Sequence, residues 1–412
     1  LTVPKLANAA GVMHTNPEIV WVPRDTKLGI YRDELANGVF LFEERPAGNR
    51  SDIKSFGYSE DIVNTSKTIK KTQDEHDHMV DQEAVLRARL LDIIINDWDR
   101  HDDQWRWAKF KEGDTKVYRP IPRDRDQVYF VNQGVLMWMA TRNWAMRKFQ
   151  GFDHKIRDIK GLGYNARFFD RTFLTEPDLD TWMDISKDIQ QKITDSIIHE
   201  AITELPPEVY ASGGKDIEMK LRSRRDNLDH YARQYYHFLS RGVDIVGTDE
   251  RDLFEVVRHE NGITAVSIFA MSDKKGRIKE KLYYREIIPD ETREVRLYGL
   301  KGKDKFVVKG EAHKGIKVRI IPGKGNDSII DRSSVRGLGK KTLVYERKDK
   351  RNYLQKGPET RLVLSNDKSI DDYNRKQFKF NKTMPLVKAG YNIDDGIFIG
   401  GGVDIKRYNF RD

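Results

Sequence analysis

The residue pattern changes near Asp244, and this change constrains the fold more than any other feature of the sequence. Before it, from Gln133 to Val243, apolar residues recur mostly at helical spacing, most clearly in LDTWMDISKDIQQKITDSIIHEAITEL. After it, short alternating runs are separated by ENG, DKKG, KGKD and PGKGND turns, a pattern typical of antiparallel sheets. We therefore expect an α+β protein in which a mostly helical domain, residues 1–243, precedes an antiparallel all-β domain, residues 244–385.

Three more elements are predicted in the first domain. The stretches IVWVP (Ile19–Pro23) and GVFLFEERP (Gly38–Pro46) resemble strands separated by a turn. A helix is expected between Asp81 and Asn96, because apolar residues recur at near-helical spacing after an Asp that can cap its start. This helix leads directly into an Asp-rich stretch.

The composition excludes several classes of protein. The 412 residues include no cysteine, which rules out disulfides, thiolate metal sites and cysteine nucleophiles in the chain. No apolar run approaches the roughly 20 residues of a membrane helix. The net charge is +9, and residues 299–356 contain 17 basic and 6 acidic residues. This segment indicates either a solvated surface or contact with anionic lipid or lipopolysaccharide; with few interleaved aromatic residues, no nucleic-acid partner is expected.

Two Asp-rich clusters, IINDWDRHDDQWRW and YRPIPRDRDQVYF, lie close together in the first domain. Carboxylates beside large apolar side chains are costly to desolvate unless a metal, a cation or a proton neutralises them. Kinases use an Asp that accepts the hydroxyl proton, an amide that reaches a metal, and a second Asp that holds the metal. Asp99, Gln104 and Asp124 have this order, with Asp126 nearby. The alternative is an ion-paired network that ties a helix end to a hairpin.

These residues carry a resemblance to a known family. The stretches NDWDRHDDQWRW and VYRPIPRDRDQVYF resemble the catalytic loop and the IPWDxD metal motif of CotH-type spore-coat kinases and, more remotely, of Golgi casein kinase and HipA-like kinases. The resemblance covers about residues 38–243 and implies a kinase-like domain that uses ATP with Mg²⁺ or Mn²⁺. It implies that Asp99 is the catalytic Asp and that Gln104, Asp124 and Asp126 serve the metal.

The same resemblance bears on the nucleotide. It implies that the strand ending in LFEERP lies against the adenine, with Glu43 and Glu44 near this cofactor. Kinases also need a Gly-rich phosphate loop and a strand Lys, and no G-x-G-x-x-G occurs in the chain. Residues 1–243 would then have an incomplete N-lobe: either that lobe precedes Leu1 or catalysis has been lost.

A second resemblance spans nearly the whole chain. HTNPEIVWVP, YRPIPRDRD, RKFQGF and VRLYGLKGKDKFVV are similar to the middle region of large bacterial envelope proteins that combine a metallophosphoesterase with a BamA-type outer-membrane barrel. It implies an outer-membrane-associated protein in which residues 386–412 begin a barrel; an ordinary edge strand is the alternative. None of the phosphoesterase's own metal motifs is present. A noncatalytic scaffold between these two modules is therefore the alternative to a kinase-like enzyme.

Two Gly-Asp turns in the β half resemble the calcium-binding nonapeptide of parallel β-rolls. They place Asp304 and Asp327 before apolar strands, where carboxylates and turn carbonyls would coordinate Ca²⁺. Leu300 and Pro322 occupy positions that are glycine in that repeat, and neighbouring lysines would repel a divalent cation. We therefore favour simple Gly-Asp turns over calcium sites.

Overall fold

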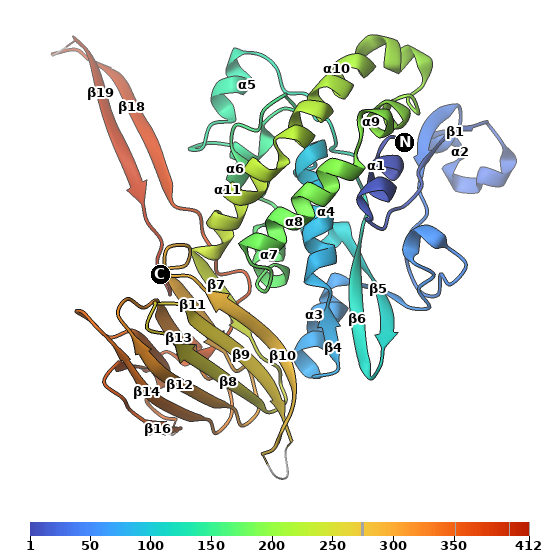
Figure 1. The fold of residues 1–412 in the computed structure, drawn as a ribbon. Coiled ribbons are helices and arrows are strands. Elements are labelled where there is room, and N and C mark those ends of the chain that lie inside the picture. Colours follow the sequence, from blue (N-terminus) through green and yellow to red (C-terminus); the bar gives the residue numbers. More distant parts are fainter. Residues whose placement is uncertain (273–275, 351, 395, 412) are drawn as a thin grey trace.

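The computed structural model describes residues 1–272, 276–350, 352–394 and 396–411. Helices and sheets are both abundant, which confirms the α+β class. Figure 1 shows a helical region that continues into a stack of strands, from which a long hairpin projects. In the part of the chain that the structure describes, no helix is both long and apolar enough to cross a membrane.

The N-terminal strands form a small sheet of their own. Strand β1 (Glu18–Val22) pairs antiparallel with β2 (Gly38–Phe42), as the sequence predicts. This pair is largely exposed and joins no other sheet among the described residues. Helix α1 (Val3–Ala10) before it is anchored in the main core through Val3 and Leu6.

A four-stranded sheet in the order β3-β5-β6-β4 positions the candidate site. Strands β5 (Trp105–Glu112) and β6 (Thr115–Pro122) form its central hairpin, flanked by β3 (Ile62–Asn64) and β4 (His78–Val80). Trp105 at the start of β5 pairs with the last residue of β6. The loop before β5 and the loop after β6 therefore leave from the same end of the hairpin.

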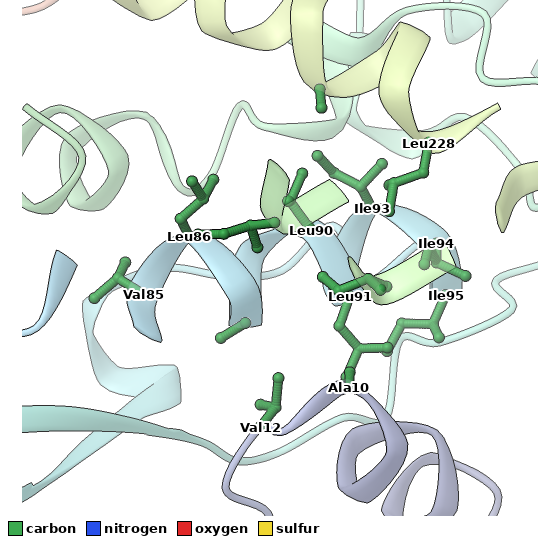
Figure 2. Close-up of a cluster of buried hydrophobic side chains, with 14 of the residues drawn as sticks. Ala10, Val12, Val85, Leu86, Leu90, Leu91, Ile93, Ile94, Ile95 and Leu228 are labelled. Atoms are coloured by element: carbon green, nitrogen blue, oxygen red, sulfur yellow. The ribbon is translucent and has the colours of Figure 1, made fainter. Parts of the chain in front are cut away.

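Helix α4 (Gln82–Ile95) runs through the core of the helical region. The carboxylate of Asp81 accepts the Ala84 N–H at 2.8 Å and caps its start. In Figure 2, apolar side chains of α4 extend both towards Ala10 and towards Leu228 on other helices. The helix ends at Asn96, whose left-handed conformation (φ 61°) turns the chain into the first Asp-rich loop.

Helices that pack directly against α4 include α1, α8 (Leu179–Lys192), α10 (Pro207–Asp226) and α11 (Leu228–Ser240). The long apolar run after residue 178 forms two helices rather than one, because the chain breaks at Ile193 and Thr194 caps the second helix by accepting the Ile197 N–H. The elements are α2 (Arg32–Leu35), α3 (Thr65–Asp74), α5 (Val135–Ala140), α6 (Ile159–Leu162), α7 (Arg167–Phe173), α8 (Leu179–Lys192), α9 (Asp195–Ile202), α10 (Pro207–Asp226) and α11 (Leu228–Ser240).

The expectation of an antiparallel β domain is wrong, because most of its strand pairs are parallel. One sheet, β17-β15-β13-β11-β7, is parallel throughout. In the other, β10-β9-β8-β12-β14-β16, only the β8–β9 and β9–β10 pairs are antiparallel. From β10 onward, consecutive strands alternate between the two sheets, so the chain winds as a flattened coil. Period-two alternation looks the same in either arrangement, and a Gly-Asp turn can cross between sheets as readily as it can reverse a strand.

This coiled part, called the solenoid below, buries an apolar interior between its sheets. Val295 is paired with Val243 and Val318 in the neighbouring coils, so that equivalent apolar residues stack. Its strands are β7 (Gly242–Val246), β8 (Asp252–Arg258), β9 (Thr264–Met271), β10 (Ile278–Ile287), β11 (Glu294–Tyr298), β12 (Lys305–Ala312), β13 (Lys317–Ile321), β14 (Ser328–Val335), β15 (Thr342–Arg347), β16 (Tyr353–Gln355) and β17 (Thr360–Ser365).

After the solenoid the chain returns to the helical region. Arg375 forms an ion pair with Asp102 and donates to the carbonyl of Phe168 at 3.3 Å. The chain then forms an antiparallel hairpin, β18 (Lys382–Asn392) and β19 (Gly396–Lys406), which pairs with no other strand among the described residues. The segment 386–412 expected to begin a barrel thus starts inside β18, and β19 is paired with the strand before it.

Candidate functional site

The two Asp-rich loops lie against each other at the open end of the β5–β6 hairpin. The Arg123 N–H donates to the Gln104 carbonyl at 3.0 Å. The fully buried guanidinium of Arg100 donates to the carbonyl oxygens of Gln104 and Arg123, both at 2.9 Å, and lies over the Trp105 ring. Residues 97–104 and 123–126 are therefore fixed side by side.

A buried ion network lies beneath these loops. Arg125 donates to Asp92 at 2.6 Å and to Asp97 at 3.3 Å, which joins the second loop to α4 and to the first loop. Arg100 lies 3.2 Å from Asp97. Three guanidinium and three carboxylate groups balance in charge; the members are Arg89, Asp92, Asp97, Arg100, Arg125 and Asp170. The network expected as the alternative reading is thus present, but it uses neither Asp99 nor Asp124.

The network perturbs its own carboxyl groups. Burial raises the pKa of Asp97 to about 6, although Arg100 beside it opposes the shift. Burial would also raise the pKa of Asp92, but Arg125, Arg100 and Arg89 outweigh it and lower that pKa below its ordinary value. Because the groups are buried, loss of one partner leaves an uncompensated charge, a change that typically costs about 3–5 kcal/mol.

Asp99 lies above this network and is only half-buried. Its carboxylate accepts a hydrogen bond from the side-chain amide of Asn165, and His101 Nε2 is 3.8 Å away. Lys148 lies near the same amide, with Nζ 3.5 Å from Asn165 Oδ1 and 4.9 Å from the ring centre of Trp98. Asn165 therefore bridges Lys148 and Asp99, the predicted catalytic Asp.

Sequence reasoning missed Asn165 and Lys148: Asn165 comes from a segment without a motif, and Lys148 lies in the RKFQGF stretch, to which no role at the site was given. It also missed the ion network, although the sequence holds a signal for it. Arg89 and Asp92 lie three residues apart on the last part of α4, residues 88–95, which is buried and otherwise apolar. A charged pair at that spacing, among such neighbours, indicates a buried partner set.

Asp124 differs from its neighbours in two ways. Its backbone is left-handed, with φ 55°, a conformation that non-glycine residues adopt rarely and that clusters at functional sites. Its carboxylate makes no hydrogen bond or ion pair within the described residues. The same holds for the side-chain amide of Gln104, which is paired with Arg123 through its backbone only. Asp126 is exposed and accepts from Gln127 at 2.9 Å.

The two glutamates predicted to lie near a nucleotide are engaged elsewhere. Glu43 accepts a hydrogen bond from the Thr15 hydroxyl, and Glu44 pairs with Arg50 at 3.1 Å. No hydrogen bond or ion pair within the described ranges connects either of them to the two Asp-rich loops. They follow β2, whose small sheet is separate from the one that carries the β5–β6 hairpin.

A third group of ligand-type side chains lies at β4, where Glu75, Asp77 and His78 come within metal-binding distance of one another. Lys116 already neutralises this group: its Nζ lies 2.8 Å from Asp77 and 3.2 Å from His78 Nε2. Lys71 pairs with Glu75 at 2.6 Å. With an ammonium group at its centre, the group is explained as an ion-paired surface.

The two candidate calcium residues form part of a ladder through the solenoid. Asp304 accepts the Asp252 N–H at 2.9 Å, Asp327 accepts the Asp304 N–H at 3.1 Å, and Asn352 accepts the Asp327 N–H at 2.8 Å. Each side chain thus bonds the backbone of the coil before it. The 23-residue step between Asp304 and Asp327 is one coil.

The two carboxyl groups of the ladder differ in whether a cation lies beside them. Lys350 lies 3.3 Å from Asp327 and also donates to the carbonyl of Gly323, so its ammonium takes the place that a cation would have between carboxylate and turn. Asp304 Oδ2 is buried and has no partner among the described residues. Burial, with Asp252 and Asp327 nearby, raises the pKa of Asp304 to about 10, so it is held as a neutral acid.

The basic segment 299–356 is partly neutralised by the rest of the solenoid. Lys309 pairs with Glu255 at 2.6 Å and Arg319 with Glu294 at 2.8 Å.

No protein-family model matches the chain, and a search of curated proteins found no match either.

Proposed function

We propose that residues 1–243 form a kinase-like phosphotransfer domain that binds a nucleotide together with Mg²⁺ or Mn²⁺. Asp99 orients or deprotonates the acceptor hydroxyl, and Asp124 with Gln104 supplies oxygen ligands for the metal. Asp126 assists from the exposed side. These roles follow the resemblance to CotH-type kinases and remain a proposal.

One observation carries this proposal: the fold uses costly buried charges to fix two loops, yet the side chains of Asp124 and Gln104 have no partner within the described part of the chain. Hard divalent cations prefer carboxylate and amide oxygens, and both are offered here from loops in contact. The left-handed Asp124 adds local strain that the surrounding network sustains. Lys148, linked to Asp99 through Asn165, supplies a positive charge near the proposed acceptor site, where a transferred phosphoryl group would need one.

The alternative is a noncatalytic scaffold that keeps the kinase-like shape. It is favoured by the absence of a G-x-G-x-x-G sequence and by the engagement of Glu43 and Glu44 with Thr15 and Arg50. On this reading, the ion network only stabilises the junction of helix and hairpin. The two readings differ in whether the unpaired oxygens bind a metal and a nucleotide.

Nucleotide binding with and without Mn²⁺ distinguishes the kinase-like enzyme from the noncatalytic scaffold. Fluorescent ATP is titrated into the wild-type protein, Asp124→Asn and the matched control Asp114→Asn, which changes an exposed Asp in the β5–β6 turn. The kinase-like reading expects Mn²⁺-dependent binding that Asp124→Asn weakens at least roughly tenfold, a loss of about 1.4 kcal/mol. The same titration is made on the longer gene product, where one exists. Absence of Mn²⁺-dependent binding in both proteins supports the scaffold.

We also propose that the chain is associated with the bacterial outer membrane through the β18–β19 hairpin. The register of the two strands puts no charged residue on one face of this hairpin. Most of the apolar side chains on that face are exposed. Strands of this length with one apolar face are typical of lipid-facing hairpins. That face comprises Thr383, Pro385, Val387, Ala389, Tyr391, Ile397, Ile399, Gly401, Val403 and Ile405. We expect Val387→Asp to remove the protein from outer-membrane fractions. Lys388→Asp, on the opposite face, should leave it there.

A further inference from the structure

Residues 131–146, called the flap here, expose more apolar surface than a soluble protein normally leaves uncovered. Leu136 is 76% exposed and Trp138 is 58% exposed. The flap contains the short helix α5, and all five residues from Val135 to Met139 are exposed. Its exposed apolar residues are Val131, Val135, Leu136, Met137, Trp138, Met139, Trp144 and Met146.

The flap is held in place rather than loosely attached. At its neck, the Asn132 side chain donates to the Phe149 carbonyl at 2.6 Å, and the Phe152 N–H donates to the Phe130 carbonyl at 2.7 Å. From the body, Arg157 donates to the carbonyl of the buried Thr141 at 2.7 Å. The fold thus orders a segment that buries little of its own apolar surface, which indicates that something else covers it.

The charges of this segment indicate which kind of partner could cover the flap. From Gln127 to Phe152 the sequence has no acidic residue, whereas Arg142, Arg147 and Lys148 are basic. Arg147 is ion-paired with Asp158 at 2.8 Å, so Arg142 is the cation that the flap itself contributes. The guanidinium of Arg142 lies 3.4 Å from the ring centre of Trp138. Apolar side chains with Trp and adjacent cations suit the interface of an anionic bilayer. A second copy docked flap to flap would bring the same cations together, which disfavours self-association.

The flap also lies beside the proposed membrane hairpin. Arg147, just beyond the flap, packs on the ring of Phe380 with 4.8 Å between guanidinium carbon and ring centre. Phe380 lies two residues before β18. In the view of Figure 1, α5 and the β18–β19 hairpin project from the same side of the helical region. The segments next to the two uncovered apolar surfaces are therefore in contact.

We propose that the flap binds the surface of an anionic phospholipid bilayer. Leu136 and Trp138 insert below the headgroups, while Arg142 stays at headgroup level beside the Trp138 ring. This inference does not depend on phosphoryl transfer. It would hold equally for a catalytic domain and for a scaffold.

Vesicle flotation tests the proposal with the 412-residue protein. Vesicles of phosphatidylcholine alone and of phosphatidylcholine with phosphatidylglycerol are compared. The wild type is expected to float with the anionic vesicles and to show a blue shift of tryptophan fluorescence. Leu136→Glu is expected to reduce this binding at least roughly tenfold. Arg142→Gln should weaken binding to anionic vesicles and leave the weak binding to neutral vesicles unchanged.

The matched control is Leu338→Glu, which changes an even more exposed leucine (99% exposed, against 76% for Leu136) in a solenoid loop. Ile399→Asp on the hairpin and Lys340→Gln in the basic segment are measured in parallel, with thermal unfolding as a check on folding. The proposal is overturned if Leu136→Glu floats like the wild type, or if only the hairpin or the basic-segment variant loses binding. A change in sedimentation by Leu136→Glu without vesicles would also overturn it, in favour of self-association.

Discussion

Arg100 donates a hydrogen bond of 2.9 Å from its buried guanidinium to the backbone carbonyl of Arg123, across the junction of the two Asp-rich loops. Arg100→Met removes this bond and leaves Asp97 without its nearest cation. We expect the free energy of unfolding to fall by about 3–5 kcal/mol, because a buried charge loses its partner. Urea unfolding measures this; the exposed Arg233→Met on α11 is the control and should change little. Equal losses in both variants would contradict the role given to Arg100.

Asp124→Gly separates strain from function. Glycine adopts the left-handed conformation found at Asp124 without steric cost, so the unfolding free energy should rise by about 1 kcal/mol. If Asp124 holds a metal, the same variant loses Mn²⁺-dependent nucleotide binding. Asp126→Gly, whose backbone is not left-handed, should gain no stability. A stability loss at Asp124 comparable to that at Asp126 would show that the conformation is not strained.

Asp304 makes stability depend on pH. Its pKa is raised to about 10 in the folded chain, whereas an unfolded Asp titrates near 4. Between these values the folded state holds a proton that the unfolded state releases, so the unfolding free energy falls as pH rises, by up to about 1.4 kcal/mol per unit. Asp304→Asn keeps the acceptor for the Asp252 N–H but does not titrate. Its stability should depend less on pH; an unchanged slope in urea titrations would rule out the neutral acid.

His76 links the helical region to the solenoid. Its Nε2 lies 2.8 Å from Asp252 and its Nδ1 lies 2.5 Å from Glu250. Burial would lower the pKa of His76, but the hydrogen bond and charge of Asp252 outweigh it and raise that pKa. The contribution to stability is therefore full below about pH 6.5, the unfolded pKa, and is lost as pH rises through the folded pKa.

His76→Gln tests this linkage by urea unfolding on both sides of that range. The loss of stability relative to the wild type should be larger in acid than in mildly alkaline buffer. The matched substitution is His230→Gln on α11, because His230 is exposed and bonds Gln234, with no carboxylate partner among the described residues. An equal loss at both pH values would mean that His76 acts through packing alone.

Local patterns predicted local structure well. The β1 and β2 strands and the α4 helix with its Asp81 cap follow from spacing and capping chemistry. The direction of the solenoid strands did not follow, because alternation is the same in parallel and antiparallel sheets. The 23-residue step from Asp304 to Asp327 was the available signal.

The candidate site was predictable only in part. The order of Asp99, Gln104 and Asp124 in the sequence placed them at one hairpin end, and the structure brings their loops together. Asn165 and Lys148 reach the site through tertiary packing of segments some fifty residues farther along the chain. Periodicity and spacing do not predict contacts of that kind, because these contacts depend on the tertiary packing of helices around α4.

The return of the chain from the solenoid to the helical region constrains the number of coils that the solenoid can have. Repeat architectures usually gain and lose coils by duplication and deletion, since each coil contacts only its neighbours. Here Arg375 ties the segment that leaves the solenoid to Asp102, and an added coil would displace that segment by about 4.8 Å. A duplication would have to lengthen the return segment at the same time, so coil number is expected to change less readily than coil sequence.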